Sequence, residues 1–447
     1  MGTTPSVEEL IAQARKPAED ALRLHPMYRG KLEVTPKCPI TDLADFAIWY
    51  SPGVAAPCRD IAEHPERVFA HTNKGNCVAI VSDGTRVLGL GDIGPHAALP
   101  VMEGKALLFK YLGGVDAFPL CLATKDPDDI VQACKWLEPS FGGINLEDIA
   151  NPKCFYILER LREELNIPVW HDDQQGTAAV MLAGLMNALK VVGKTQDAVK
   201  ISMIGAGAAN IAVSRVLIAA GFPADHLVMV DTKGILHKDR DDLRTPENSA
   251  KWHICELSNG ERRKGGIPEA MHGTDVCIAL SRPEPGLIKP EWVASMAKDA
   301  IVFACANPLP EIWPWEAKDA GARIVATGRS DFANQVNNAL GFPAIFRGVL
   351  DVEATKITEE MCIAAAEELA TCAEEKGLSE AYILPHMDDR DAFPREAAAV
   401  GMKAIEQGVA RRAMTKEALL RKASSFIKRA RDATQILMEH GIIPKAG

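Results

Sequence analysis

The stretch VKISMIGAGAAN, residues 199–210, decides the fold of one half of this chain. An apolar run that reads as a strand leads into a glycine-rich turn, and residues that favour a helix follow to about Gly221. Gly205 allows the tight turn, and Gly207 lets the backbone approach a pyrophosphate at the start of the helix, where free N–H groups bind anions. This order of strand, glycine turn and helix is typical of dinucleotide-binding folds.

The glycine turn and the strand after it predict a nicotinamide dinucleotide site. The third position of the pattern is Asn210 instead of Gly or Ala, so an ordinary tight turn is the alternative. Asp231 ends the next strand, LVMVD, where a carboxylate can bind the ribose hydroxyls of NAD. Lys233 could instead face the 2′-phosphate of NADP, and we favour NAD. The residues predicted to surround the cofactor here are Gly205, Gly207, Ala208, Ala209, Asn210, Asp231 and Lys233.

Composition narrows the class of protein. The 447 residues suit two or three domains, and 47% hydrophobic and 25% charged residues are ordinary for a globular chain. The net charge of −10 argues against nucleic acid or an anionic membrane as the main partner. We expect a cytoplasmic protein, because we find neither a signal-peptide core nor an uncharged apolar run long enough to span a membrane. The 11 cysteines form no CxxC pair, which argues against a zinc knot or a disulfide ladder.

Strands and helices alternate over most of the chain, which predicts an α/β fold with parallel sheets. One exception is expected over residues 76–91, where two apolar runs joined at Asp83-Gly84 predict a hairpin. Beyond about Glu353 the sequence predicts only helices. The predicted division is an N-terminal α/β domain for substrate and metal (1–174), a Rossmann-type doubly wound nucleotide domain (175–345) and a helical C-terminal segment that packs on both (346–447).

Carboxylates end two neighbouring strands of the first domain. The run GGINLED ends in Glu147 and Asp148, and IPVWHDD ends in Asp172 and Asp173. One helix joins these strands, so parallel pairing would bring all of these acids to one edge of the sheet. Oxygen-only ligands favour a hard cation such as Mg²⁺ or Mn²⁺. The alternative is that Asp148 and Asp172 cap the helices that follow them.

Three other residues are candidates for chemistry. Lys105 lies on a helix of small and apolar residues, and burial beside a metal would lower its pKa and make it a base. If it reaches solvent instead, it is an ordinary surface lysine. Tyr50, in WYSPGVA, is a packing residue or an acid, and Asn307, after an apolar strand, either contacts a ligand or forms a turn before Pro308.

Taken together, the ordered blocks of this chain resemble the malic enzymes, and the compact prokaryotic type most closely. The resemblance runs from about residue 25 to about residue 410. The blocks that carry it are YSPGVA (50–55), LGLGDIGPHAALPVMEGKA (88–106), FGGINLEDI (141–149), PVWHDDQQGTA (168–178), GAGAAN (205–210), CANPLPEI (305–312) and ATGRSDFANQVNNALGFPAIFRGVLD (326–351). It implies oxidative decarboxylation of L-malate to pyruvate and CO₂ with reduction of NAD(P), decarboxylation of oxaloacetate, and a homodimer or higher homo-oligomer.

The resemblance also implies roles for individual residues. Tyr50 matches the general acid, Lys105 the general base, and Asp172 an acid that supports the lysine. The matching metal ligands are Glu147, Asp148 and Asp173. The residues that match contacts to substrate or nicotinamide are Arg86, Asn307 and Asn338.

Three alternatives stay open at this point. A malolactic-type lyase would share most of the blocks but release lactate instead of pyruvate. Amino-acid dehydrogenases also pair a lysine-bearing α/β domain with a Rossmann domain, although the INLED block disfavours them. A non-catalytic nucleotide-sensing protein could keep the same fold, but the intact Tyr50, Lys105 and acidic residues argue against the decay of a site.

Overall fold

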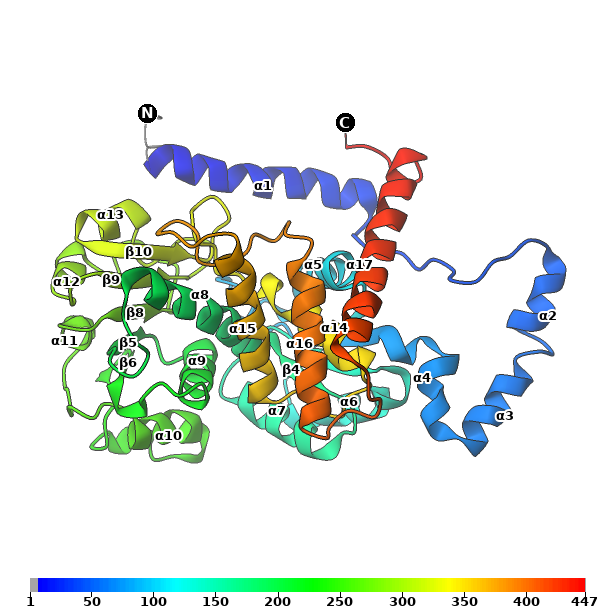
Figure 1. Ribbon diagram of the computed structural model, residues 1–447, viewed down its shortest axis with the longest axis horizontal. Helices are drawn as coiled ribbons and strands as arrows, with labels where there is room; N and C mark the ends of the chain where they lie inside the picture. Colours follow the sequence, from blue (N-terminus) through cyan, green and yellow to red (C-terminus); the bar gives the residue numbers. More distant parts are fainter. Residues whose placement is uncertain (1–6, 447) are drawn as a thin grey trace.

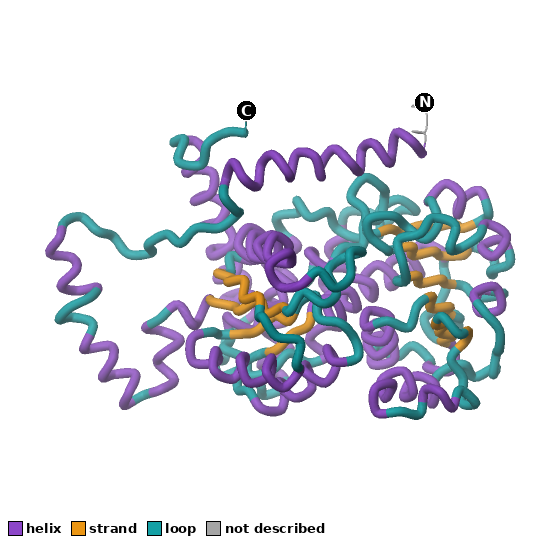
Figure 2. Tube along the Cα trace, turned by 180° about the vertical axis from the view of Figure 1, so that it is seen from behind, coloured by secondary structure: helices purple, strands orange, loops and turns teal. Residues whose placement is uncertain are grey.

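The computed structural model describes residues 7–446 and has an α/β architecture. Two sheets lie side by side, each with helices on both faces, and long C-terminal helices pack against both (Figures 1 and 2). The predicted fold class, with a Rossmann-type second unit and a helical C-terminus, is confirmed.

The first sheet is four-stranded and parallel, and its buried strands read as continuous apolar runs. Its strands in spatial order are β2 (Asp116–Cys121), β1 (Cys77–Ser82), β3 (Gly143–Leu146) and β4 (Val169–His171). Its helices are α6 (Pro127–Leu137) and α7 (Lys153–Glu164) on one face and α5 (Gly94–Gly113) and α14 (Phe342–Asp351) on the other.

The hairpin predicted over residues 76–91 is wrong, because β1 pairs in parallel with β2 and β3. The chain does turn after Asp83, and Gly84 takes a left-handed φ of +68°. The Asp83 carboxylate, however, is fully buried and forms an ion pair with Lys153 at the start of α7. The turn is therefore fixed to the next layer of the domain, and the residues after it form a loop in place of a returning strand.

The second sheet has six strands in the order of a Rossmann fold, with β5 and β8 adjacent at its centre. Its strands in spatial order are β10 (Ala322–Thr327), β9 (Ala300–Ala304), β8 (Val276–Ala279), β5 (Ile201–Ile204), β6 (Leu227–Asp231) and the short antiparallel β7 (Gly234–Ile235). One face carries α9 (Ala208–Ala219) and α10 (Ser249–Leu257), and the other carries α11 (Ile267–Met271), α12 (Pro290–Ala294) and α13 (Pro314–Asp319).

Helix α8 (Thr177–Val192) connects the two sheets. It continues from a π-helical turn over Asp172–Gly176 and ends at Gly193, whose φ of +68° makes it the predicted C-terminal stop. Among the described residues, Asp172–Val192 is the one helical stretch long and apolar enough to cross a membrane, yet 78% of its apolar window is buried inside the protein. It is thus a core helix, packed on α9 and on the C-terminal helix α15 (Glu359–Glu375).

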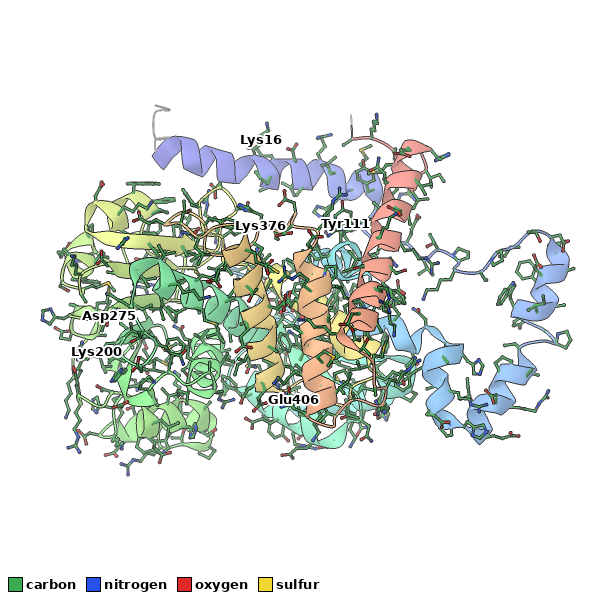
Figure 3. The ribbon with its side chains drawn as sticks, viewed as in Figure 1. Lys16, Tyr111, Lys200, Asp275, Lys376 and Glu406 are labelled. Atoms are coloured by element: carbon green, nitrogen blue, oxygen red, sulfur yellow. The ribbon has the colours of Figure 1, made fainter. Side chains whose placement is uncertain are left out.

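The remaining C-terminal helices are α16 (Ala392–Glu406) and α17 (Lys416–Glu439). Helix α17 packs on α5, where the Arg431 guanidinium lies 5.4 Å from the ring of Tyr111, which Figure 3 labels beside it. The division at residues 174 and 345 stays a prediction, and α14 runs through the second of these positions.

The N-terminal region is open. Helix α1 (Val7–Tyr28) lies along the outside of the molecule, and the chain then extends away from both sheets (Figures 1 and 2). We call residues 32–73 the N-terminal arm; it contains α2 (Phe46–Trp49), α3 (Ala55–Glu63) and α4 (Val68–His71). No side chain in the arm is buried. Its exposed large hydrophobic residues include Val34, Leu43, Phe46, Ile48, Trp49 and Tyr50.

Candidate functional site

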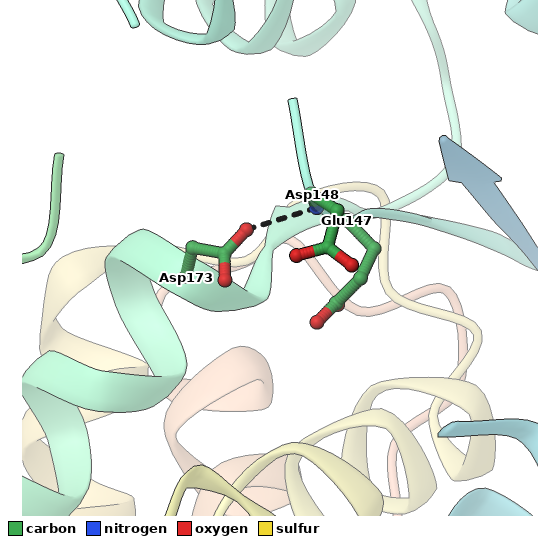
Figure 4. A group of neighbouring side chains, drawn as sticks. All are labelled: Glu147, Asp148 and Asp173. Atoms are coloured by element: carbon green, nitrogen blue, oxygen red, sulfur yellow. Dashed lines mark hydrogen bonds between the residues drawn. The ribbon is translucent and has the colours of Figure 1, made fainter. Parts of the chain in front are cut away.

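The predicted acidic residues converge at the carboxyl edge of the first sheet (Figure 4). Glu147 and Asp148 follow β3, and Asp173 follows β4, which pairs with β3 in parallel. One oxygen from each of the three carboxylates lies within 4.8 Å of the others. The backbone N–H of Asp148 also donates to the Asp173 carboxylate at 3.0 Å, which ties the two strand ends together.

These carboxylates lie where their charges need compensation. Burial, together with the neighbouring acids and against the attraction of Lys105, raises the pKa of Glu147 well above its ordinary value. Burial and the charge of Asp173 raise the pKa of Asp148 to about 8. One buried oxygen of Asp148, Oδ2, has no hydrogen-bond partner among the described residues. An all-oxygen cluster of this kind fits a hard divalent cation such as Mg²⁺ or Mn²⁺.

Lys105 reaches this cluster from α5. Its Nζ lies 2.8 Å from Glu147 Oε1 and forms a second ion pair with Asp172. Burial alone would lower the pKa of Lys105, but the charges and hydrogen bonds of Asp172 and Glu147 outweigh burial and raise it. The lowered pKa expected for this lysine is therefore not produced by the protein groups alone, since two anions hold the proton on it.

Asp172 anchors the lysine from the opposite side. Its side chain is fully buried; Oδ1 accepts a hydrogen bond from Trp170 Nε1 at 3.1 Å, and Oδ2 accepts one from Asn338 Nδ2 at 2.5 Å. Burial raises its pKa, and Lys105 opposes that shift. The position of the Asp172 carboxylate requires glycine at residue 176, because a Cβ there would lie 1.9 Å from Asp172 Oδ1.

The alternative that Asp148 and Asp172 are helix caps is wrong. Within residues 7–446, neither carboxylate accepts a hydrogen bond from the start of α7 or α8. Asp172 is engaged with Lys105, and Asp148 faces the other acids of the cluster. Neither acid therefore caps the helix that follows it.

The glycine turn lies at the carboxyl end of β5, at the start of α9. Gly205 has a φ of +98°, and a Cβ on it would lie 2.9 Å from the carbonyl oxygen of Leu280. Asn210, which departs from the usual pattern, is buried and donates from Nδ2 to the carbonyl oxygens of Ile204 at 3.0 Å and Gly205 at 2.7 Å. It therefore holds the turn from inside. The turn continues through Gly207, Ala208 and Ala209 into the helix.

Asp231 ends β6 as predicted, but its carboxylate is paired with an arginine that the sequence analysis did not identify. Arg240 donates to both Asp231 oxygens, at 3.1 and 3.0 Å, and also to Asp242. Lys233 donates to Asp242 at 3.0 Å. Two cations and two anions thus share this end of the nucleotide domain, and nothing in local sequence pattern marks Arg240 as the partner.

Arg86 and Asn307 lie on loops of different sheets that approach one another. The backbone N–H of Arg86 donates to the Asp148 carbonyl at 3.0 Å, which places this loop beside the acidic cluster. Within that loop, a Cβ on Gly89 would lie 3.4 Å from the Asn307 carbonyl oxygen. The Asn307 amide rests on Gly328, where a Cβ would lie 2.7 Å from its Nδ2. The carboxyl edges of the two sheets therefore face each other across these loops.

Tyr50 is the predicted residue that the fold does not bring to this site within one chain. It follows α2 on the N-terminal arm, and its side chain is 74% exposed. Among the described residues its hydroxyl makes no hydrogen bond, and the arm points away from both sheets (Figure 1).

Comparisons with known proteins agree with this architecture. The sequence profile "Malic enzyme, N-terminal domain" matches residues 29–162, and "Malic enzyme, NAD binding domain" matches residues 174–405. The chain is 52% identical over 393 residues to the "Bifunctional malic/malolactic enzyme" of Bacillus subtilis (88% of this chain, 94% of that protein). It is 50% identical over 383 residues to the "NAD-dependent malic enzyme" of Geobacillus stearothermophilus (86% of this chain, 78% of that protein).

Solved structures show the same likeness. The malic enzyme of Entamoeba histolytica superposes with a TM-score of 0.97 at 46% identity, covering 100% of this chain and 94% of that one. The malic enzyme of Pyrococcus horikoshii superposes with a TM-score of 0.89 at 49% identity, covering 94% and 98%. Two profiles follow one another along the chain, and both relatives and both solved structures share this identity and coverage. The chain belongs to the malic enzyme family.

Proposed function

We propose that this chain oxidises L-malate with NAD(P) and decarboxylates the product to pyruvate and CO₂, and that it also decarboxylates oxaloacetate. The observation that carries the proposal is Lys105, buried between Glu147 and Asp172 beside a cluster of carboxylates. Dehydrogenation of an alcohol needs a base at the hydroxyl and an acceptor for hydride. The glycine turn of the second sheet supplies the support for the acceptor.

The residues divide the work as follows. Glu147, Asp148 and Asp173 would hold Mg²⁺ or Mn²⁺, which when bound polarises the C2 oxygen of malate and offsets the negative charge around Lys105. Lys105 takes the proton of the C2 hydroxyl as C2 gives up hydride. Asp172, fixed by its own hydrogen bonds, keeps Lys105 in place. Tyr50 protonates C3 after C4 has left as CO₂.

Substrate contacts in this proposal come from both sheets. Arg86 binds a carboxylate of malate, while Asn307 and Asn338 contact substrate and the nicotinamide. What supports this is their position: Arg86 is next to the acidic cluster, Asn338 bonds Asp172, and Asn307 lies on the facing loop. We place NAD ahead of NADP because Asp231 stands where the adenine ribose binds in this fold. Arg240 and Lys233 are the groups that would favour NADP instead.

We further propose a homodimer in which Tyr50 acts in the site of the second copy. The arm that carries Tyr50 also exposes Val34 and Leu43, each 83% exposed. Contiguous exposed apolar side chains mark an interaction surface. A second copy is the occupant that fits, because the reaction needs Tyr50 near a Lys105, and the arm that carries Tyr50 after α2 extends away from both sheets of its own chain (Figure 1). We place the protein in the cytoplasm, with no nucleic acid or membrane as partner.

A malolactic reaction is the second candidate, because the Bacillus subtilis relative is named for both reactions. One assay separates the candidates: purified protein with L-malate, Mn²⁺ and either NAD or NADP, followed by NAD(P)H absorbance and by product analysis. We expect NADH and pyruvate to accumulate in equal amounts. Lactate without net NADH would favour the lyase. The absence of both pyruvate and lactate would reject the proposed function.

A further inference from the structure

Glu311 is a buried carboxylate that the mechanism above does not use. It lies in the loop after β9 and has no exposed surface. Its Oε1 accepts a hydrogen bond from the backbone N–H of Ser281 at 2.9 Å, and its Oε2 accepts one from the N–H of Ala306 at 3.1 Å. Its own carbonyl oxygen accepts from the N–H groups of Gly286 and Ile288, each at 3.1 Å. One residue thus joins the loops that follow two adjacent strands.

Both of these loops support groups assigned to the cofactor and substrate. Ala306 directly precedes Asn307 in the chain. Ser281 lies behind the glycine turn, because a Cβ on Gly205 would approach its Cα to 3.2 Å. The Glu311 carboxylate therefore contacts the support of Asn307 with one oxygen and the support of Gly205 with the other.

A carboxylate is a costly choice for this position. Burial raises the pKa of Glu311 to about 7, although the backbone hydrogen bonds from Ser281 and Ala306 act to lower it. Among the described residues no lysine, arginine or histidine pairs with it. An ionised carboxylate offers an acceptor on each of its two oxygens, whereas the amide of glutamine offers only one. Two N–H groups from separate loops therefore explain why glutamate stands here in spite of its burial.

We propose that Glu311 is a positioning residue that sets the distance between the glycine turn and Asn307, and so shapes the site for the nicotinamide dinucleotide. This rests on the proposed function only in that it takes these two loops to bind the cofactor. Glu311 touches neither substrate nor cofactor. Its effect on binding is transmitted through Ser281 and Ala306.

The test measures NADH binding directly. NADH fluorescence is titrated with wild-type protein and with Glu311→Gln in the absence of malate and metal, so turnover is not needed. At about pH 8 the wild-type carboxylate is ionised and the variant has lost one acceptor, and we expect the dissociation constant to rise about tenfold. At about pH 6 the protonated wild-type side chain, like that of glutamine, has one carbonyl oxygen that accepts and one group that donates, so the two affinities should converge.

The matched control is Glu316→Gln. Glu316 also accepts from a backbone N–H, that of Trp313 at 3.3 Å, but at the start of α13 instead of between the two loops. We expect Glu316→Gln to leave NADH affinity unchanged, because its bond lies outside the two loops that Glu311 joins. Equal NADH affinity of wild type and Glu311→Gln at about pH 8 would overturn the proposal, as would an equal loss in the control.

The pH test uses the difference in NADH affinity between wild type and Glu311→Gln, so groups that behave alike in both proteins do not affect it. The nearest titratable neighbours of Glu311 are the thiols of Cys277 and Cys305, whose pKa values burial raises, so both stay protonated over this range. The pair Arg282–Glu284 lies in the exposed turn beyond Ser281. The acidic cluster is the same in both proteins, so it does not contribute to the difference between them. If Glu311→Gln does not fold, Glu311→Asp replaces it at about pH 8, because the shorter side chain cannot reach both N–H groups, and an NADH affinity equal to that of wild type rejects the idea. A wild-type protein that binds NADH but turns over no malate would count against the activity alone.

Discussion

The Lys105 ammonium lies 2.8 Å from the Glu147 carboxylate, although Lys105 comes from helix α5 and Glu147 follows strand β3. Glu147 is at the same time one of the three acids whose oxygens lie within 4.8 Å of one another in the predicted metal site. The predicted base and the predicted metal site therefore share a carboxylate. A change in the charge at the metal site is expected to alter the pKa of Lys105, and a change in the charge of Lys105 is expected to alter the pKa of Glu147.

Lys105→Ala should nearly abolish malate oxidation while leaving NAD binding intact. A positioned base contributes on the order of 10²–10⁴ in rate, and no other lysine contacts this cluster among the described residues. Initial rates with malate and NADH fluorescence titrations check the two halves of the claim. Lys110→Ala, on the same helix but paired with Asp116 at the surface, is the control. Near-wild-type turnover by Lys105→Ala would remove it as the base.

Asp173→Ala should weaken Mn²⁺ binding, because it removes one of three carboxylates whose oxygens lie within 4.8 Å. The measurement is a Mn²⁺ titration of activity, supported by a direct Mn²⁺ binding isotherm. Asp128→Ala, on α6 and bonded to Tyr156, serves as the surface control. A Mn²⁺ curve that coincides with that of wild type excludes Asp173 as a ligand.

Gly176→Ala should inactivate the protein without removing any functional group. Its new Cβ would lie 1.9 Å from Asp172 Oδ1, so the carboxylate that holds Lys105 has to move. Misplacing a catalytic group by about 1 Å costs roughly 10²-fold in rate. Gly104→Ala is the control, since nothing lies within 4 Å of a Cβ there. Comparable rates for the two variants would show that Asp172 does not need its present position.

Tyr50→Phe and Lys105→Ala, each inactive alone, should regain activity when refolded together. In a mixed dimer one site combines an intact Lys105 with an intact Tyr50 from the other chain, and the second site has neither. Half of the dimers are mixed and each has one working site, so recovery should approach about a quarter of the wild-type rate if pairing is random. Sedimentation gives the dimer fraction. No recovery in a solution that contains mixed dimers would place Tyr50 in the site of its own chain.

Glu396→Gln should stabilise the folded chain at alkaline pH. Glu396 is fully buried, neither oxygen has a hydrogen-bond partner among the described residues, and burial raises its pKa well above 4.5. The folded wild-type chain therefore keeps a proton that the unfolded chain releases, so its stability falls as pH rises above that ordinary value, by about 1.4 kcal/mol per pH unit until the folded pKa is reached. Urea unfolding at several pH values measures the difference. Parallel curves, as expected for the surface variant Glu406→Gln, would contradict the assigned burial.

Much of the fold could be predicted because local pattern and tertiary structure agree. The strands of both sheets follow buried apolar runs, and the strand ends that hold Glu147 and Asp173 needed only the rule that parallel strands end at one edge. The hairpin failed because its turn looked local while its fixing contact, Asp83 to Lys153, joins residues 70 positions apart.

The site could be predicted in its residues but less well in its electrostatics. The protonation of Lys105 depends on how closely two buried acids approach it, and sequence spacing does not give that distance. Glu311 and Arg240 were missed for the same reason, since each acts through contacts with separate loops. The position of Tyr50 depends on the arm, in which no side chain is buried against the rest of the chain.

Helix α8 has a consequence that reaches beyond either sheet. The π-helical turn that precedes it, Asp172–Gly176, carries Asp172 and Asp173 of one site, and both this turn and the helix body pack on α9, which begins at the glycine turn of the other. One continuous helical segment therefore contacts parts of both sites and provides a path by which occupancy of one can affect the other. If a bound cation raises the affinity for the nucleotide by some factor, the bound nucleotide must raise the affinity for the cation by the same factor.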